Sequence, residues 1–220
     1  EFDPDNTYRE PFHSSESQSD TLKFMNDFGY FDYAYSKDFH FVKKPLENQY
    51  QSFCWIIPKK GMSLEEVEDQ LTEKKLSQLR KNTYKQRMFL KVPKITLEQS
   101  VDMKPILQEM GAASMFEPDA DFSNMTADSI FVGAISQKSK IDVNEEKIVA
   151  ASITLVQGLV GSAAGVPNPD EPIEVYADVP FMFLIVDQKT NGIFFMGRYA
   201  VPTEEDLQKS NEEYEVIRYH

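Results

Sequence analysis

The sequence predicts an α+β fold, built mostly from antiparallel strands with a few short helices. Three aromatic or apolar runs, Tyr30–Tyr35, Phe39–Val42 and Gln51–Ile57, follow one another with brief polar breaks, which is typical of an antiparallel meander. Two more apolar runs, Phe181–Val186 and Ile193–Met196, flank an Asn-Gly turn signal, which indicates a closing hairpin. Helix signals are fewer and shorter than strand signals, so sheets should dominate the fold.

Capping residues mark the starts of three helices. Ser63 and Glu66 have the spacing of a capping box, in which each side chain accepts a hydrogen bond from the other residue's amide. Thr72 is a second N-cap and Asp102 a third, with Gly111 in the position just past the end of its helix. The apolar positions expected on one side of these helices are Leu64, Val67, Leu71, Leu76, Leu79, Ile106, Leu107 and Met110.

The remaining segments alternate between strand and irregular patterns. Met88–Val92 and Ser129–Val143 are predicted strands, the second of them long. A stretch rich in Gly, Ala and Pro follows from Gly158 to Pro172, and a loop of this length inside a compact domain is usually functional. The first 20 residues are polar and rich in turn signals. The acidic segment after Pro202 is expected to be a solvated, mobile tail.

Composition and charge exclude several classes of partner. The 220 residues include 36 Asp and Glu against 23 Lys and Arg, which gives a net charge of −13. Such an acidic chain is a poor match for a phosphate backbone or an anionic lipid surface. No apolar stretch is long enough to span a bilayer, and no signal peptide is predicted at the start. Neither nucleic acid nor a membrane is therefore a predicted partner.

Motifs for catalysis or metal binding are not found in the sequence. His13, His40 and His220 lie in dissimilar contexts without metal-ligand spacing. Asp119–Ser123 begins like a calcium loop, but the Gly and the Glu that such a loop requires further on are missing. Cys54 lies in an apolar run and is predicted to be a buried core residue rather than a nucleophile. We expect no catalytic residues, no metal and no cofactor, and the protein is not predicted to be an enzyme.

Three groups of segments, in this order along the chain, resemble the C-terminal part of a serpin. The resemblance extends over residues 1–202 and leaves 203–220 as an acidic tail. The N-terminal helices of the family and several strands of its large sheet have no counterpart in this sequence. The matching segments are Phe89–Ile95 with Asp102–Gly111, then Ile141–Glu146, and finally Ala177–Ile185 with Phe195–Arg198.

The resemblance implies a mechanism that depends on a conformational change. A serpin offers an exposed loop to a protease, which forms its acyl-enzyme on that loop, and the cut loop then inserts as a strand into the large sheet and traps the enzyme. The corresponding reactive loop here is Glu145–Pro180. Its hinge is implied to consist of Glu145, Glu146, Lys147, Ile148, Val149, Ala150, Ala151 and Ser152, although the family pattern has Gly and Thr where Lys147 and Ile148 stand.

The composition of the loop indicates what it could do. Alternate residues from Ile148 to Gly158 are small, apolar or hydroxyl-bearing, so burial as an inserted strand is permitted. The usual loop length of the family places the scissile bond near Gly161 and Ser162. There is no Lys or Arg from Ile148 to Val179, which excludes a trypsin-like target. The predicted target is an elastase-, chymotrypsin- or subtilisin-like protease, or a cysteine protease.

Several alternatives stay open from the sequence. The chain could be an inhibitor, a non-inhibitory carrier, or a truncated scaffold that binds the N-terminal part of the same fold. Residues 148–156 could also form an ordinary core strand. Asn124 begins a glycosylation pattern, Asn-Met-Thr. The compartment is not determined by the single cysteine, with an extracellular location favoured over a cytoplasmic one.

Overall fold

The chain folds into two compact units dominated by strands. The computed structural model describes residues 2–46, 48–145, 168–190 and 192–217, with side chains as far as Asn211 in the last helix. One unit consists of residues 1–95 and 143–220, and the other of residues 96–142. The prediction of an α+β fold with mostly antiparallel strands and a few helices is confirmed.

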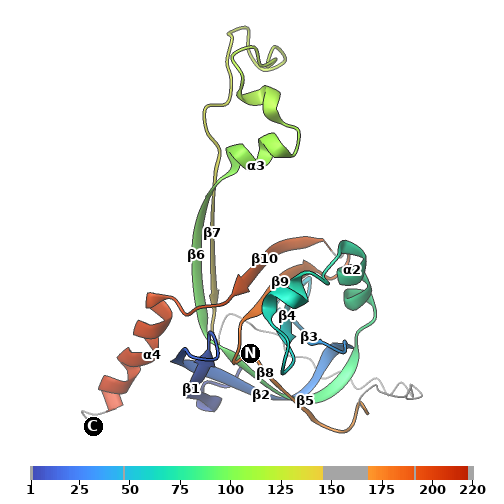
Figure 1. Cartoon of the computed structure of the whole chain (residues 1–220), viewed down its shortest axis with the longest axis vertical. Coiled ribbons are helices and arrows are strands. Elements are labelled where there is room, and N and C mark those ends of the chain that lie inside the picture. The colour runs from blue at the N-terminus through green and yellow to red at the C-terminus, as the bar shows by residue number, and fades with distance from the viewer. Residues whose placement is uncertain (1, 47, 146–167, 191, 218–220) are drawn as a thin grey trace. The chain divides into compact units, whose positions relative to one another are not determined.

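An eight-stranded sheet forms the larger unit. Its strands are β1 (Thr7–His13), β2 (Ser19–Tyr35), β3 (Phe39–Pro45), β4 (Gln51–Pro58), β5 (Tyr84–Pro93), β8 (Ile173–Tyr176), β9 (Phe181–Asp187) and β10 (Ile193–Tyr199). Their order is β10-β9-β4-β3-β2-β5-β8, with β1 paired to the first part of β2 (Figure 1). Among the strands that the structure describes, only β5 and β8 pair in parallel. The predicted meander and the closing hairpin are both confirmed.

The core lies between this sheet and two short helices, α1 (Leu64–Glu68) and α2 (Glu73–Lys81). Apolar side chains of both helices pack against residues of β2, β3, β4 and β9. Within the described part of the chain, no helix is long and apolar enough to cross a bilayer. The core cluster consists of Ala34, Phe39, Phe41, Cys54, Ile56, Val67, Leu76, Leu79, Leu184 and Val186.

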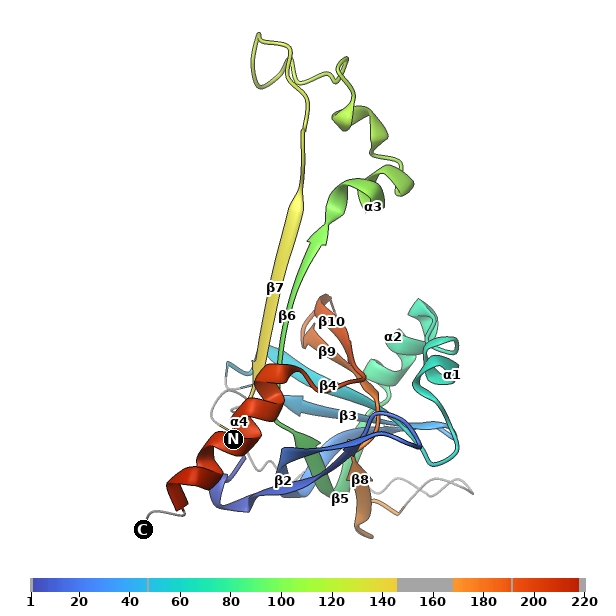
Figure 2. The same ribbon diagram turned by 60° about the vertical axis from the view of Figure 1, so that its left-hand side comes forward.

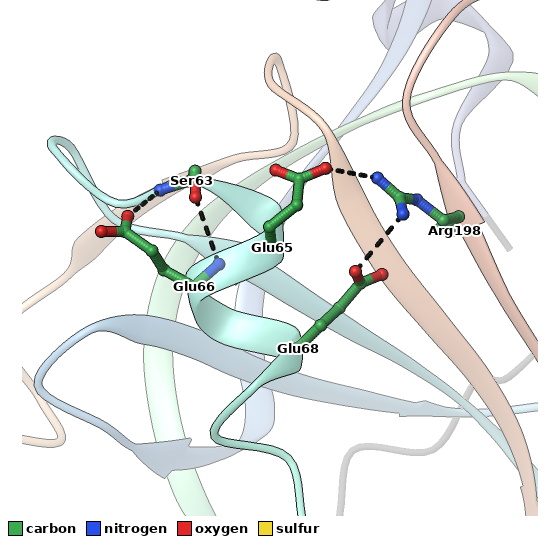
Figure 3. Close-up of polar contacts among 5 residues, drawn as sticks. All are labelled: Ser63, Glu65, Glu66, Glu68 and Arg198. Atoms are coloured by element: carbon green, nitrogen blue, oxygen red, sulfur yellow. Dashed lines mark hydrogen bonds and ion pairs between the residues drawn. The ribbon is translucent and has the colours of Figure 1, made fainter.

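Local hydrogen bonds determine where α1 begins. The Ser63 amide donates to the Glu66 carboxylate at 2.8 Å, and the Glu66 amide donates to the Ser63 hydroxyl at 3.1 Å (Figure 3). This confirms the predicted capping box, and Thr72 caps α2 as predicted. The guanidinium of Arg198 lies 2.7 Å from Glu65 and 3.3 Å from Glu68, and so connects β10 to the same helix (Figure 3).

Cys54 is part of this core, as the sequence predicts. Its side chain is completely buried in β4. Burial raises the pKa of the Cys54 thiol to about 12, so the group stays protonated at neutral pH. A protonated, buried thiol is inert as a nucleophile.

The smaller unit contains most of a two-stranded sheet and the third helix. Its elements are β6 (Ile95–Asp102), α3 (Met103–Glu109), the 3-10 turn η2 (Ala113–Phe116) and β7 (Ser136–Val143), and β6 pairs with β7 (Figure 2). Asp102 caps α3 as predicted, and Gly111 has φ = +95° just past its end. The expected apolar side of α3 is largely exposed, including Ile106 and Met110.

The predicted strand from Ser129 to Val143 is correct only in its second half, because β7 begins at Ser136. The backbone before it bonds to the region around α3 and η2 instead of a neighbouring strand. The Val132 amide donates to the Met115 carbonyl at 2.9 Å, and the Met103 amide donates to the Ile135 carbonyl at 2.8 Å. The apolar composition of residues 129–135 is therefore not sufficient to make them a strand.

The two ends of the chain are more ordered than the sequence suggests. The first 20 residues, expected to be turn-rich, form the 3-10 turn η1 (Pro4–Asn6) and β1, whose Phe12 is completely buried. The expected solvated tail instead forms α4 (Glu204–Ile217). Asp206 and Ser210 are buried on one side of this helix, which explains why the segment is not a free tail.

A partly buried histidine makes the stability of the larger unit depend on pH. The Nδ1 atom of His40, in β3, lies 3.1 Å from the Tyr33 hydroxyl. Burial, together with the nearby charge of Lys59, lowers the pKa of His40 from 6.5 to about 4. Because the unfolded chain binds this proton more tightly, the contribution of neutral His40 to stability is present above pH 6.5 and is lost as the pH falls toward 4.

The wild-type chain should lose unfolding free energy as the pH falls from 6.5 to 4, and we predict that His40→Gln reduces this loss. The reduction should be about 1.4 kcal/mol for each factor of ten by which the proton affinity of His40 differs between the folded and the unfolded chain. Urea unfolding at a series of pH values measures this. His13→Gln, at an exposed position of β1, is the control. An unchanged pH dependence in His40→Gln would contradict the prediction.

Candidate functional site

The structure describes both ends of the predicted reactive loop. Glu145 ends the described segment that follows β7, and the chain is described again from Asn168. The predicted hinge residues Glu146–Ser152 and the predicted scissile pair Gly161–Ser162 lie outside the described residues. The candidate site is therefore built from the two places where the loop leaves and rejoins the larger unit.

The loop leaves the unit at a partly buried ion pair, which we call the proximal anchor (Phe2, Thr7, Lys94 and Glu145). The Lys94 ammonium lies 2.8 Å from the Glu145 carboxylate. The Thr7 hydroxyl donates to the same carboxylate at 2.8 Å, and the Phe2 amide donates to the Glu145 carbonyl at 3.3 Å. Both the side chain and the backbone of Glu145 are thus fixed.

Burial and charge act in opposite directions on Glu145, whose side chain is only 11% exposed. Burial alone raises the pKa of the Glu145 carboxyl and is the largest single influence. The hydrogen bonds from Lys94, from the backbone and from Thr7 together outweigh it, so the pKa of Glu145 is below its ordinary value. The residue that leads into the loop is therefore a stable carboxylate at neutral pH.

The loop rejoins the unit at Gln86, the centre of what we call the distal anchor (Tyr30, Gln86, Arg87 and Asn168–Glu171). The Gln86 amide nitrogen donates to the carbonyls of Asn168 at 3.1 Å and of Glu171 at 2.9 Å, and a third carbonyl, that of Pro169, lies at 3.4 Å. The Arg87 amide donates to the Pro169 carbonyl at 2.9 Å. The Tyr30 hydroxyl donates to Asp170 at 3.1 Å.

The inward position of Gln86 on β5 explains why its side chain bonds to the carbonyls of the returning loop. Alternate residues of β5 point into the core, and Gln86, Met88 and Leu90 are all buried. A buried carboxamide needs partners, and the loop carbonyls accept from its nitrogen. Its Oε1 atom has no hydrogen-bond partner within the described residues. The Gln86 side chain therefore holds the returning loop through the hydrogen bonds of its amide nitrogen.

Past the distal anchor, the chain continues as β8, parallel to β5. The Ala177 amide then donates to the Lys91 carbonyl at 2.8 Å, and the His13 amide of β1 donates to the Asp178 carbonyl at 2.7 Å. Ala177 is completely buried. The segment between the loop and β9 is thus paired with β5 on one side and contacts β1 at its end.

An exposed aromatic surface borders the distal anchor. The rings of Phe28 and Phe89, in neighbouring positions of β2 and β5, stack with centroids 4.2 Å apart. The Arg87 guanidinium lies 4.9 Å from the Phe28 centroid. An open groove of about 590 Å³ runs beside the pair and is lined by residues that include Phe28, Phe89 and Tyr176. Stacking and the cation–π contact support the strand pair that carries Gln86.

Other residues singled out in the sequence lie apart from this site. Asn124 is exposed in a turn of the smaller unit. His13 lies in β1 and His40 in β3, bonded to Tyr33. Among the described residues, no group of three or more His, Cys, Asp or Glu side chains is arranged to bind a metal ion.

Comparison with known proteins identifies the family. The model of the family described as "Serpin (serine protease inhibitor)" matches residues 1–202, almost the whole chain. The chain belongs to the serpin family. Two solved structures support the fold. Mouse protein-Z dependent protease inhibitor matches with a TM-score of 0.75 and 23% identity, and the match covers 92% of this chain and 51% of that one. The thermophilic serpin tengpin in its native state matches with a TM-score of 0.73 and 24% identity, and the match covers 91% of this chain and 51% of that one.

Individual relatives agree with this assignment. Serpin B3 of Homo sapiens is 29% identical over 206 residues, which are 91% of this chain and 52% of that protein. The leukocyte elastase inhibitor of Bos taurus is 30% identical over 201 residues, 87% of this chain and 52% of that protein. Iripin-8 of Ixodes ricinus is 36% identical over 147 residues, 66% of this chain and 36% of that protein. This serpin chain spans about half of the length of the first two relatives.

Sequence reasoning found only part of the candidate site. Glu145 was identified through the resemblance, and its role as the first hinge residue stays a prediction. Lys94, Thr7 and Gln86 were not identified as site residues. A signal in the sequence could have identified Gln86. It is a polar residue at an inward position of an alternating strand that also contains Met88 and Leu90.

Gln86→Leu should weaken the distal anchor, because the loop carbonyls of Asn168 and Glu171 lose the donor that Gln86 provides. We predict a loss of about 1–3 kcal/mol of unfolding free energy, measured by urea denaturation. Gln78→Leu, at an exposed position of α2, is the matched control and should change stability far less. Equal effects of the two substitutions would contradict the role assigned to Gln86.

Glu145→Gln should weaken the proximal anchor, since it keeps an acceptor for Thr7 but removes the charge that pairs with Lys94. The expected loss at pH 7 is about 1.5–3 kcal/mol. The Glu145 contribution is present above the ordinary carboxyl pKa of 4.5 and is lost as the pH falls through the lower folded value. The difference between wild type and variant should therefore shrink in acid.

Urea unfolding at pH 7 and at acid pH measures this difference. Glu98→Gln is the control, because the Glu98 carboxylate is 66% exposed and lies 3.7 Å from Lys140. A difference between wild type and Glu145→Gln that did not change with pH would contradict the pairing.

Proposed function

We propose that this chain presents residues 145–180 as the reactive loop of a serpin-type protease inhibitor. The observation that carries the proposal is the pair of anchors, which fix Glu145 on one side and Asn168–Glu171 on the other. A bait loop must be held at both ends, so that a protease can bind the segment between them without unfolding the sheet.

The distance between the two anchors supports the use of residues 146–167 as a bait segment. Gln86 and Lys94 are eight residues apart on β5 and its immediate continuation, or about 26 Å at the rise of a strand. The 22 residues from 146 to 167 could span about 75 Å when extended. The segment is therefore much longer than a connection between the anchors requires, and the surplus is available to a protease.

The sequence of the loop supports a particular class of target. From Ile148 to Val179 there is no Lys or Arg, so the acidic specificity pocket of a trypsin-like enzyme would find no cation. Small and aliphatic residues dominate around Gly161 and Ser162. We propose an elastase-, chymotrypsin- or subtilisin-like protease as the target, or a cysteine protease with similar preference.

Trapping by insertion would require a sheet that can accept the loop as a strand. The alternate residues Ile148, Ala150 and Ser152 carry no charge and could be buried. The sheet that continues directly into Glu145 is the pair of β6 and β7. We propose that the cut loop inserts beside β7, and that further strands of the serpin fold would complete the sheet.

A second candidate function is that of a fold fragment that acts together with the N-terminal part of a serpin. The observation that favours it is β10, which pairs only with β9 among the described strands and carries exposed Phe194, Phe195 and Met196. Unpaired edges with large apolar side chains are association surfaces. The relatives compared above are about twice as long as the chain, so the occupant proposed for this surface is the N-terminal part of the same fold.

Incubation with elastase-, chymotrypsin- and subtilisin-like proteases tests the main proposal. An inhibitor forms an acyl-enzyme that survives denaturation, so a band at the summed mass should appear on a denaturing gel. Trypsin should give no such band. Each protease with its active-site serine blocked beforehand is a second control.

Cleavage in the loop without a band at the summed mass would contradict inhibition, and would favour the non-inhibitory or fragment function. An intact segment from 146 to 167 after prolonged incubation with every protease would contradict its use as bait.

A further inference from the structure

The match to the serpin family ends at residue 202, and the helix α4 begins two residues later, at Glu204. Its first turn is fixed by reciprocal hydrogen bonds. The Thr203 amide donates to the Asp206 carboxylate at 3.0 Å, and the Asp206 amide donates to the Thr203 hydroxyl at 3.1 Å. This is the arrangement of a capping box with Asp in place of Glu. The start of α4 is therefore encoded locally, in residues beyond the family match.

A buried tyrosine connects α4 to the core of the larger unit. The Tyr199 hydroxyl, at the end of β10, donates to the Asp206 carboxylate at 2.8 Å, and both side chains are buried. The Tyr199 ring contacts Phe12 of β1, with centroids 5.2 Å apart, and Phe181 of β9 at 5.6 Å. Hydrogen bonds to a carboxylate are among the stronger ones in proteins, so this contact fixes α4 firmly.

The helix then runs beside the part of the sheet that contains β1 and β2 (Figures 1 and 2). Ser210 is buried on the helix. The Arg9 guanidinium of β1 donates to Asn211 of α4 at 3.0 Å. At the other end of β1, the His13 amide donates to the Asp178 carbonyl, which belongs to the segment that returns from the loop.

We propose that α4 is a clamp that holds β1 against the sheet and, through β1, restrains the returning segment Ile173–Asp178. A continuous series of contacts supports this: α4 to β1 through Arg9 and Asn211, β1 to the core through Phe12 and Tyr199, and β1 to Asp178 through His13. The restraint would oppose detachment of the returning segment when the loop is pulled or cut. Only this last consequence rests on the proposed function.

Lys209→Pro in the full chain tests the clamp, because proline breaks a helix interior and Lys209 is not part of the contact with Tyr199. Lys209→Ala is the matched control, which also removes the Lys209–Glu205 ion pair but keeps the helix. The readout is amide hydrogen exchange, measured by mass spectrometry on peptides that contain Thr7–His13, Ile173–Asp178 and, as an internal reference, Gln51–Pro58.

We expect Lys209→Pro to raise exchange about tenfold or more in the first two peptides, the effect of about 1.4 kcal/mol of lost local stability, with the reference peptide unchanged. Lys209→Ala should resemble wild type. Faster exchange in α4 alone, with β1 and Ile173–Asp178 unchanged, would overturn the proposal.

If Lys209→Pro does not fold, the double variant Tyr199→Phe with Asp206→Ala replaces it, since it removes the contact without leaving a buried hydroxyl unpaired. The same increase is expected relative to wild type, and unchanged exchange in β1 would again overturn the clamp. Because no target protease is present while the folded chain exchanges, the outcome is independent of whether the loop is bait.

Discussion

The pairing of β5 with β2 determines where both anchors of the loop lie. Gln86 is near the start of β5, and Lys94 follows its end directly. Because β5 is in register with β2 from Phe24 to Tyr33 and with β8 on its other side, the two residues have a fixed separation. The reactive loop proposed for residues 145–180 would need a rigid frame around the segment that a protease binds. Here β5 and the residue directly after it contact both ends of that loop.

Features that depend on nearby residues were predictable from the sequence. The N-caps at Ser63, Thr72 and Asp102 are hydrogen bonds between residues two or three apart, so the residue types and their spacing determine them. The meander and the closing hairpin were predictable for a similar reason, since short polar breaks leave neighbouring strands few other partners. The buried state of Cys54 followed from the apolar run around it.

Features that depend on distant partners were not predictable in the same way. β1 and β8 are short and partly polar, and only pairing with β2 and β5 makes them strands. Residues 129–135 are apolar, yet their backbone bonds lead to the region around η2 and α3. The acidic segment after Pro202 has a locally encoded helix start, but α4 also packs on the larger unit through Arg9, which lies 202 residues before its partner Asn211. In the candidate site, the loop carbonyls that accept from Gln86 are more than 80 residues away in the sequence.

The most direct test of this account is the position of the first cut in the native chain. Brief digestion with a broad-specificity protease, followed by mass spectrometry of the first fragments, locates it. The two-anchor frame predicts that the first cuts fall between Glu145 and Asn168, while β5, β8 and the residues that form the anchors stay intact. First cuts in residues 129–135 or near β10, with residues 146–167 uncut, would contradict the claim that the frame presents this segment as bait.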